Sequence, residues 1–153
     1  MEMEKSAAVI EDLVETLEDG AKGFEQAAEL LADGENAGDL ASEMRALASE
    51  RRQMSGEMRD MAASLGHDID EEGSAGGAIH RAWMSLKDAM TGTDPHAVLA
   101  TAEEGEDHAV SEYEDALAKD DLTPALRALI ERQAQAVKRA HDKVRALRDR
   151  FDD

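Results

Sequence analysis

The chain has 153 residues, of which 36 are Asp or Glu and 17 are Lys or Arg, so its formal net charge is −19 at pH 7. This length suits a single domain over residues 1–153, and because only 3% of residues are aromatic, Ala, Leu, Val and Met must fill its core. Because there is no cysteine, disulfides and thiolate metal sites are excluded, and so acidic a surface disfavours nucleic acid as a partner.

Two long helices are predicted in the first half of the chain. Apolar residues recur at steps of three and four over residues 6–33 and again over residues 40–65, the spacing of one buried helix face. Gly34 ends the first helix and Gly66 the second, as glycine commonly does after the last helical turn. The short connection between these helices predicts an antiparallel pair.

A long connection follows the second helix. Residues 67–76 are rich in charged residues and glycine and are expected to form a loop, whereas residues 77–91 are predicted to form a short amphipathic helix. The apolar residues of this short helix are Ile79, Trp83, Leu86 and Met90.

Two proline-marked helix starts define the second half of the chain. Asp94 before Pro95 is a strong N-terminal cap, and it predicts a third long helix over residues 95–119. Thr123 before Pro124 repeats the signal and predicts a fourth helix over residues 124–151. The short link between them predicts a second antiparallel pair.

The connection between the two helix pairs decides the topology. It has nearly thirty residues, and its short helix alone is about 22 Å long, enough to travel along a bundle. One long crossover between two helical hairpins is the ferritin-like arrangement. The sequence therefore predicts an all-α, ferritin-like four-helix bundle with a short extra helix in the crossover. The alternative is a simple up-down bundle whose third helix is broken at Gly92.

Polar residues within the apolar stripes are the informative feature of these helices. At about 100° per residue, the seams of the second, third and fourth helices contain Arg51, Glu106 and Gln133. Beside a seam lie Glu18, Glu50, Glu103 and His141. Because each residue lies near the middle of its helix, side-by-side packing brings all of them to a similar depth.

One interpretation of these residues is a metal site for iron or manganese. The candidate ligands are Glu18, Glu50, Glu103, Glu106 and His141. Hard cations prefer anionic oxygen ligands, and a histidine adds nitrogen. The two Glu-x-x-His motifs of two-metal bundles are absent, which weighs against this interpretation.

The other interpretation is a buried polar network without metal. In it, Arg51 forms a two-pronged ion pair with Glu106, and Gln133 satisfies the remaining polar groups. A buried charge must be paired, and a guanidinium close to a divalent cation is unfavourable. Arg51 therefore favours this interpretation, in which no cofactor is bound.

Charge is distributed unevenly along the chain. Residues 1–122 contain 31 acidic and 9 basic residues, whereas residues 123–153 contain 8 basic and 5 acidic residues. The last helix is thus a basic helix on an acidic bundle. This pattern fits either attraction between neighbouring helices or contact with a partner.

The pattern as a whole resembles a family of bacterial ferritin-like four-helix-bundle proteins that carry a domain-of-unknown-function label. The residues that carry the likeness are Asp19-Gly20, Gly23-Phe24, Ala27-Ala28, Arg51, Gly73-Ser74, His80-Arg81-x-Trp83, Leu86-Lys87, Glu103-x-Gly105-Glu106-Asp107, Tyr113, Gln133, Val137 and His141-Asp142. The resemblance implies a ferritin-like fold. Ferritin-like relatives in the broad sense store iron or perform di-iron oxidation and peroxide chemistry.

Three functions follow as expectations. The first is a ferritin-like bundle of unsettled role that binds iron or manganese and serves in stress. The second is a di-iron or manganese carboxylate oxidoreductase, and the third is a non-catalytic structural or interaction bundle. Whether the protein is an enzyme stays open. We expect a cytoplasmic protein that forms homo-oligomers through helix faces, with no membrane span, since no run of about 18 apolar residues occurs, and no signal peptide.

Overall fold

The computed structural model describes residues 2–32, 37–67 and 94–151. These residues form four long helices, α1 (Glu2–Ala32), α2 (Ala37–Ser64), α4 (Pro95–Leu117) and α5 (Pro124–Asp149). They correspond to the four helices predicted from apolar periodicity, with ends that differ by a few residues. The predicted short helix at 77–91 lies outside the described residues.

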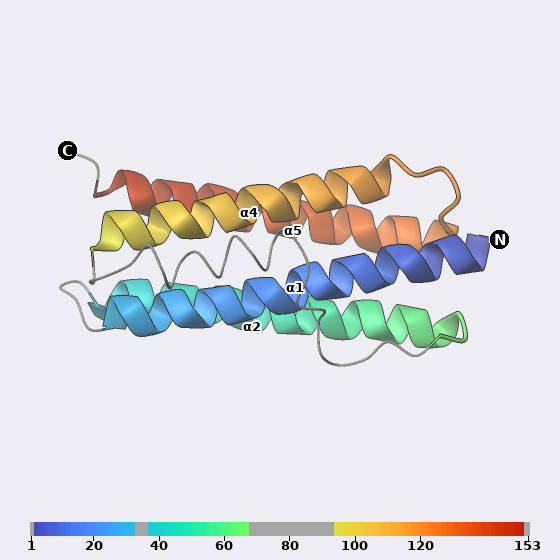
Figure 1. Cartoon of the computed structure of the whole chain (residues 1–153), viewed down its shortest axis with the longest axis horizontal. Helices are drawn as coiled ribbons and strands as arrows, with labels where there is room; N and C mark the ends of the chain where they lie inside the picture. Colours follow the sequence, from blue (N-terminus) through green and yellow to red (C-terminus); the bar gives the residue numbers. More distant parts are fainter. Residues whose placement is uncertain (1, 33–36, 68–93, 152–153) are drawn as a thin grey trace.

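The helix directions confirm the predicted ferritin-like arrangement (Figure 1). α1 and α2 are antiparallel, and so are α4 and α5. α2 and α4 run in the same direction, so α2 ends at the opposite end of the bundle from the start of α4. An up-down bundle would make these two helices antiparallel. The chain therefore has the two hairpins and long crossover of a ferritin-like bundle.

The predicted helix starts are capped as the sequence indicates. The side chain of Asp94 accepts a hydrogen bond from the backbone N–H of His96 at 3.2 Å. The hydroxyl of Thr123 accepts one from the backbone N–H of Leu126 at 3.3 Å. In each helix a proline follows the cap, where the first turn needs no N–H donor.

α2 ends in a Schellman motif centred on Gly66. The backbone N–H of His67 donates to the carbonyl of Ala62 at 2.9 Å, and that of Gly66 donates to Ala63 at 3.0 Å. The motif requires a left-handed residue, and Gly66 has φ 84°. The glycine therefore fixes the point at which α2 stops.

The core is made mainly of aliphatic and alanine side chains from all four helices. α1 packs against both α2 and α4, while α5 packs mainly on α4. Small residues permit this close approach, and Phe24 and Tyr113 are the buried aromatic residues of the described chain. Among the described residues, no helix has the length and apolar character needed to cross a membrane.

Candidate functional site

An ion pair between α2 and α4 occupies the centre of the bundle. Arg51 and Glu106 are both 0% exposed, and Nη1 of Arg51 lies 2.8 Å from Oε1 of Glu106. Nη2 binds the second carboxylate oxygen, so the pair is bidentate. The guanidinium also lies over the ring of Phe24, 5.3 Å from its centroid, in a cation–π contact.

Glycine on α1 makes room for this arginine. A Cβ added at Gly20 would lie 3.3 Å from Nη1 of Arg51, which is tighter than an ordinary contact. Burial raises the pKa of Glu106, and the charge of Arg51 opposes that rise. α1, α2 and α4 thus all contribute to holding one charge pair inside the apolar core.

Gln133 forms a separate set of hydrogen bonds beside this pair. The hydroxyl of Tyr113 donates to Oε1 of Gln133 at 2.7 Å. Nε2 of Gln133 donates to the carbonyl of Met54 at 3.1 Å and to Oε1 of Glu57 at 3.0 Å. These contacts join α2, α4 and α5. From the sequence, Gln133 is expected to satisfy the polar groups left by the buried ion pair. Its side chain bonds instead to Tyr113, Met54 and Glu57, and Nε of Arg51 has no hydrogen-bond partner among the described residues.

The centre of the bundle does not fit a two-metal carboxylate site built on Glu106. Both oxygens of this carboxylate are bound by Arg51, and a fixed guanidinium would repel a divalent cation at the same place. Glu18, from α1, is likewise engaged by α2: its Oε1 accepts from Ser55 at 2.6 Å and from Arg59 at 2.9 Å. Glu50 is half-buried on α2.

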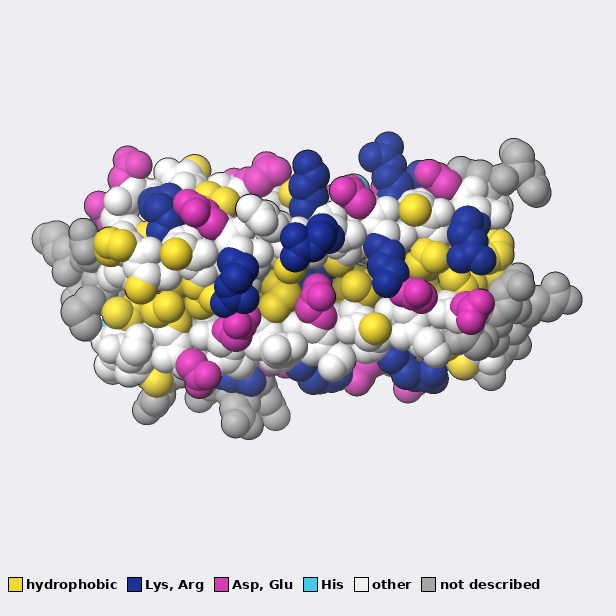
Figure 2. Space-filling view, turned by 180° about the vertical axis from the view of Figure 1, so that it is seen from behind, with side chains coloured by type: hydrophobic (Ala, Val, Ile, Leu, Met, Phe, Trp, Pro, Cys, Tyr) yellow, Lys and Arg dark blue, Asp and Glu magenta, His cyan; other side chains and the backbone are white. Residues whose placement is uncertain are grey.

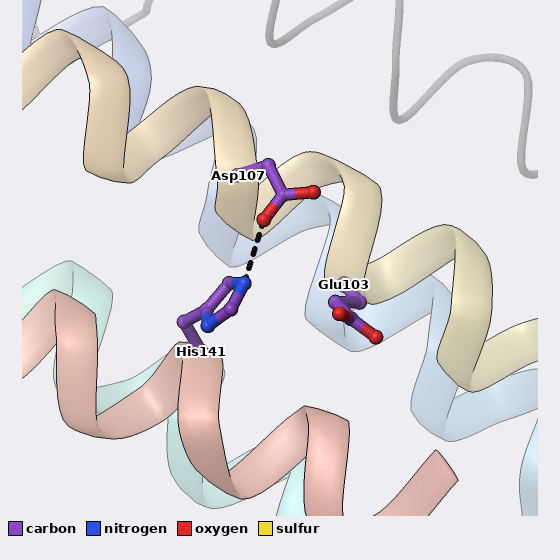
Figure 3. A group of neighbouring side chains, drawn as sticks. All are labelled: Glu103, Asp107 and His141. Atoms are coloured by element: carbon purple, nitrogen blue, oxygen red, sulfur yellow. Dashed lines mark hydrogen bonds and ion pairs between the residues drawn. The ribbon is translucent and has the colours of Figure 1, made fainter. Parts of the chain in front are cut away.

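The structure brings two of the predicted ligands together elsewhere, on the face between α4 and α5. Glu103, Asp107 and His141, called the α4–α5 group below, each offer one ligand atom, and these atoms lie within 4.8 Å of one another. Figure 3 shows the His141 ring of α5 pointing toward Asp107 of α4, with Glu103 about one turn away on the same helix. Glu18, Glu50 and Glu106 lie outside this group.

Existing contacts hold the group together. Nε2 of His141 lies 2.6 Å from Oδ1 of Asp107, and its Nδ1 lies 3.3 Å from Oδ1 of Asp142. Oε2 of Glu103 forms an ion pair with Arg148 at 2.5 Å, without the geometry of a hydrogen bond. The side chains of Glu103 and His141 are 12% and 15% exposed, whereas that of Asp107 is 64% exposed.

The protonation of His141 is set by opposing effects. Burial lowers its pKa, but the hydrogen bonds to Asp142 and Asp107 and the charges of Asp107 and Glu103 together raise the pKa above the ordinary histidine value. A metal ion binds the neutral imidazole, so it would have to compete with this proton. The group can therefore hold either a proton or a cation between the same side chains.

Two members of this arrangement were not selected from the sequence as site residues. Asp107 follows Glu103 by four residues, which places both on one face of α4. Arg148 follows His141 by seven residues, or two turns of α5. These spacings are visible in the sequence, but they are common on exposed helices and single out no site alone.

Comparisons with known proteins agree with this fold. No curated protein matches the chain. A solved structure of a mutant of Dps1 from Mycobacterium smegmatis is similar with a TM-score of 0.76 at 15% sequence identity, over 99% of this chain and 97% of that chain. At this identity the likeness concerns the fold alone. The family described as "Domain of unknown function (DUF2383)" matches residues 5–119, and the chain belongs to this family.

Proposed function

We propose that this protein binds one divalent transition-metal ion, iron or manganese, at the α4–α5 group. The observation that carries the proposal is the convergence of one imidazole and two carboxylates from two helices, with ligand atoms within 4.8 Å of one another. Carboxylate oxygens suit manganese and iron in their divalent states, and an imidazole adds affinity for iron. The ferritin-like fold is consistent with metal binding but does not by itself assign it.

Charge around the group supports a single cation. Glu103, Asp107 and the neighbouring Asp142 supply three carboxylates, while Arg148 supplies one fixed positive charge. An incoming ion would take the place of the proton shared by His141 and Asp107. Oε2 of Glu103 makes no hydrogen bond, and an incoming ion would replace its ion pair with Arg148.

A second candidate function is a non-catalytic interaction bundle. The observation that favours it is the Arg51–Glu106 pair, which occupies the centre of the bundle with a structural contact. A di-iron or dimanganese oxidoreductase is disfavoured for the same reason, because such chemistry in a bundle uses a carboxylate-rich core. Metal titration separates these candidates.

The test is a calorimetric titration of untagged, chelator-treated protein with Mn²⁺, and with Fe²⁺ under anaerobic conditions. We expect one ion per chain, and a loss of affinity of about tenfold or more in His141→Ala and in Asp107→Asn. Glu104→Gln is the matched control, since Glu104 is an exposed carboxylate on the same helix but outside the group. Unchanged affinity in both group variants would contradict the proposal. Two ions per chain, lost in Glu106→Gln, would favour the buried two-metal centre.

A further inference from the structure

Arg148 differs from Arg132 and Lys143 of the same helix in the carboxylates that it meets. Figure 2, which views the bundle from the side of α2 and α5, shows Lys and Arg side chains in a row with Asp and Glu beside them. On that side Arg132 binds Glu57 of α2, and Lys143 binds Glu43 of α2. Each of these contacts joins one basic residue of α5 to one carboxylate of a neighbouring helix. Arg148 instead meets two carboxylates, one on α4 and one on its own helix.

The two carboxylates hold Arg148 in different ways. Nη2 of Arg148 donates a hydrogen bond to Oδ1 of Asp149 at 2.8 Å, and Nε donates to the same oxygen at 3.3 Å. Nη1 lies 2.5 Å from Oε2 of Glu103, but without the geometry of a hydrogen bond. The contact with Glu103 can therefore open without the loss of a hydrogen bond between the two residues, and Asp149 keeps the guanidinium paired.

Glu103 is the member of the α4–α5 group that Arg148 holds. In Figure 3 a dashed line joins His141 to Asp107, and none joins Glu103 to either residue. The side chain of Glu103 is only 12% exposed, so water stabilises its charge poorly and a positive partner is needed. In the metal-free protein that partner is Arg148. An ion that enters the group gains Glu103 as a ligand only when this arginine moves away.

We infer that Arg148 competes with the metal ion for Glu103 and transfers to Asp149 when an ion binds, an inference that rests on the proposed function. The guanidinium carries one positive charge and a divalent ion carries two, so the exchange strengthens the attraction to Glu103 and Asp107. Asp149 is 53% exposed and already bound to Arg148, so the displaced guanidinium needs no new partner. Arg148 thereby lowers the affinity of the group for metal and keeps Glu103 paired until an ion arrives.

The test is a calorimetric titration of variants of the full chain with Mn²⁺. We expect Arg148→Met to bind Mn²⁺ about fivefold more tightly than the wild-type protein, because no ion pair has to open. A purely structural role of Arg148 would instead weaken binding in this variant. Arg148→Lys keeps the positive charge and should bind about as the wild type does. Arg145→Met is the matched control, since Arg145 is an exposed arginine of the same helix without an ion pair in the described part of the chain. It should leave the affinity unchanged.

Double variants test the transfer from Glu103 to Asp149. Asp149→Asn removes the receiving carboxylate, so it should weaken Mn²⁺ binding about threefold when Arg148 is present and leave it unchanged in the Arg148→Met background. An effect of charge at a distance would be the same in both backgrounds. In the Glu103→Gln background the arginine has no carboxylate of the group to hold. There Arg148→Met should raise the affinity no more than Arg145→Met does.

The outcomes separate this inference from the proposed function. If the wild type binds one ion and Arg148→Met binds it no more tightly than Arg145→Met, the competition is overturned and metal binding stays intact. If Arg148→Met binds an ion and the wild type binds none, the competition is supported and the proposed function is overturned. Equal effects of Asp149→Asn in both backgrounds would overturn the transfer to Asp149. Absence of binding in the wild type and in Arg148→Met would overturn both proposals.

Discussion

Glu106 at the centre of the bundle and Glu103 one turn earlier on α4 each meet an arginine. The side chains of Arg51 and Glu106 are 0% and 1% exposed, and the contact is bidentate. The side chains of Arg148 and Glu103 are 26% and 12% exposed, and their ion pair has no hydrogen-bond geometry. The two contacts use the same residue types at different depths of the same bundle.

The difference separates a structural contact from a contact that can exchange partners. A charge removed from water needs a close partner of opposite charge, and both oxygens of Glu106 are committed to Arg51. Arg148 is 26% exposed, so water can solvate its guanidinium when it leaves Glu103, and that exchange costs less than opening the fully buried pair. Only the second kind of contact can open for an ion, which is why we place the proposed function on the α4–α5 face.

The strongest test of this comparison is Arg51→Met. Removing the guanidinium leaves Glu106 buried without a cation, and such a change typically destabilises a protein by about 3–5 kcal/mol. The free energy of unfolding, measured by urea denaturation, should fall by that amount. Arg148→Met removes the corresponding arginine near the surface and should cost about 1 kcal/mol or less.

The double variant Arg51→Met/Glu106→Leu is the control for the buried pair. Replacing both members of a buried ion pair with apolar residues is often neutral or stabilising, so we expect it to regain most of the lost stability. If Arg51→Met were no more costly than Arg148→Met, the distinction between the two depths would not hold.

A pair of helical glycines provides a smaller test of how tightly the buried arginine is held. Replacing Gly with Ala inside a helix stabilises the folded protein by about 1 kcal/mol when the added methyl group fits. At Gly56, an added Cβ meets nothing within 4 Å, so Gly56→Ala should stabilise the protein by about that amount. At Gly20, the Cβ would press on Arg51, which cannot shift without disturbing its bonds to Glu106.

We therefore expect Gly20→Ala to show none of the stabilisation expected for Gly56→Ala. The difference between the two variants is measured by thermal unfolding. Equal stabilisation of both would show that Arg51 has room to move.

The fold was predictable because its main signals are local. Asp94 and Thr123 cap helices through atoms two or three residues away, and Gly66 ends α2 through its own backbone. Apolar periodicity likewise depends on each helix alone. The crossover followed from the length of one connection, because a short link cannot join parallel helices.

The site was less predictable because it depends on how helices are rotated against each other. The 100° spacing placed Arg51 and Glu106 in their seams, and the structure pairs them. The same spacing could not show that Gln133 turns to Tyr113 and Glu57, or that Asp107 meets His141. Those contacts are set by the packing of α5 against α4 and α2, which a periodic pattern does not encode.

A last and smaller test concerns a surface where carboxylates gather without an arginine. Glu112 lines a cleft of about 140 Å³ between α1 and α4, together with Asp12 and Asp115. Burial raises the pKa of Glu112, the charges of Asp12, Asp115 and Glu15 raise it further, and His108 lowers it. The folded chain therefore binds this proton more tightly than the unfolded chain does.

Because the pKa of Glu112 is higher in the folded chain than in the unfolded chain, binding of this proton stabilises the fold. This stabilisation is fully present below the unfolded pKa, near 4.5, and is lost as pH rises through the folded pKa. Glu112→Gln should thus stabilise the protein at pH 7, by about 0.5 kcal/mol because water screens the half-exposed group. The gain should vanish in acid and shrink with added salt. The exposed Glu29→Gln on α1 is the control for charge alone. Equal, pH-independent gains in both variants would attribute the effect to net charge and not to this cleft.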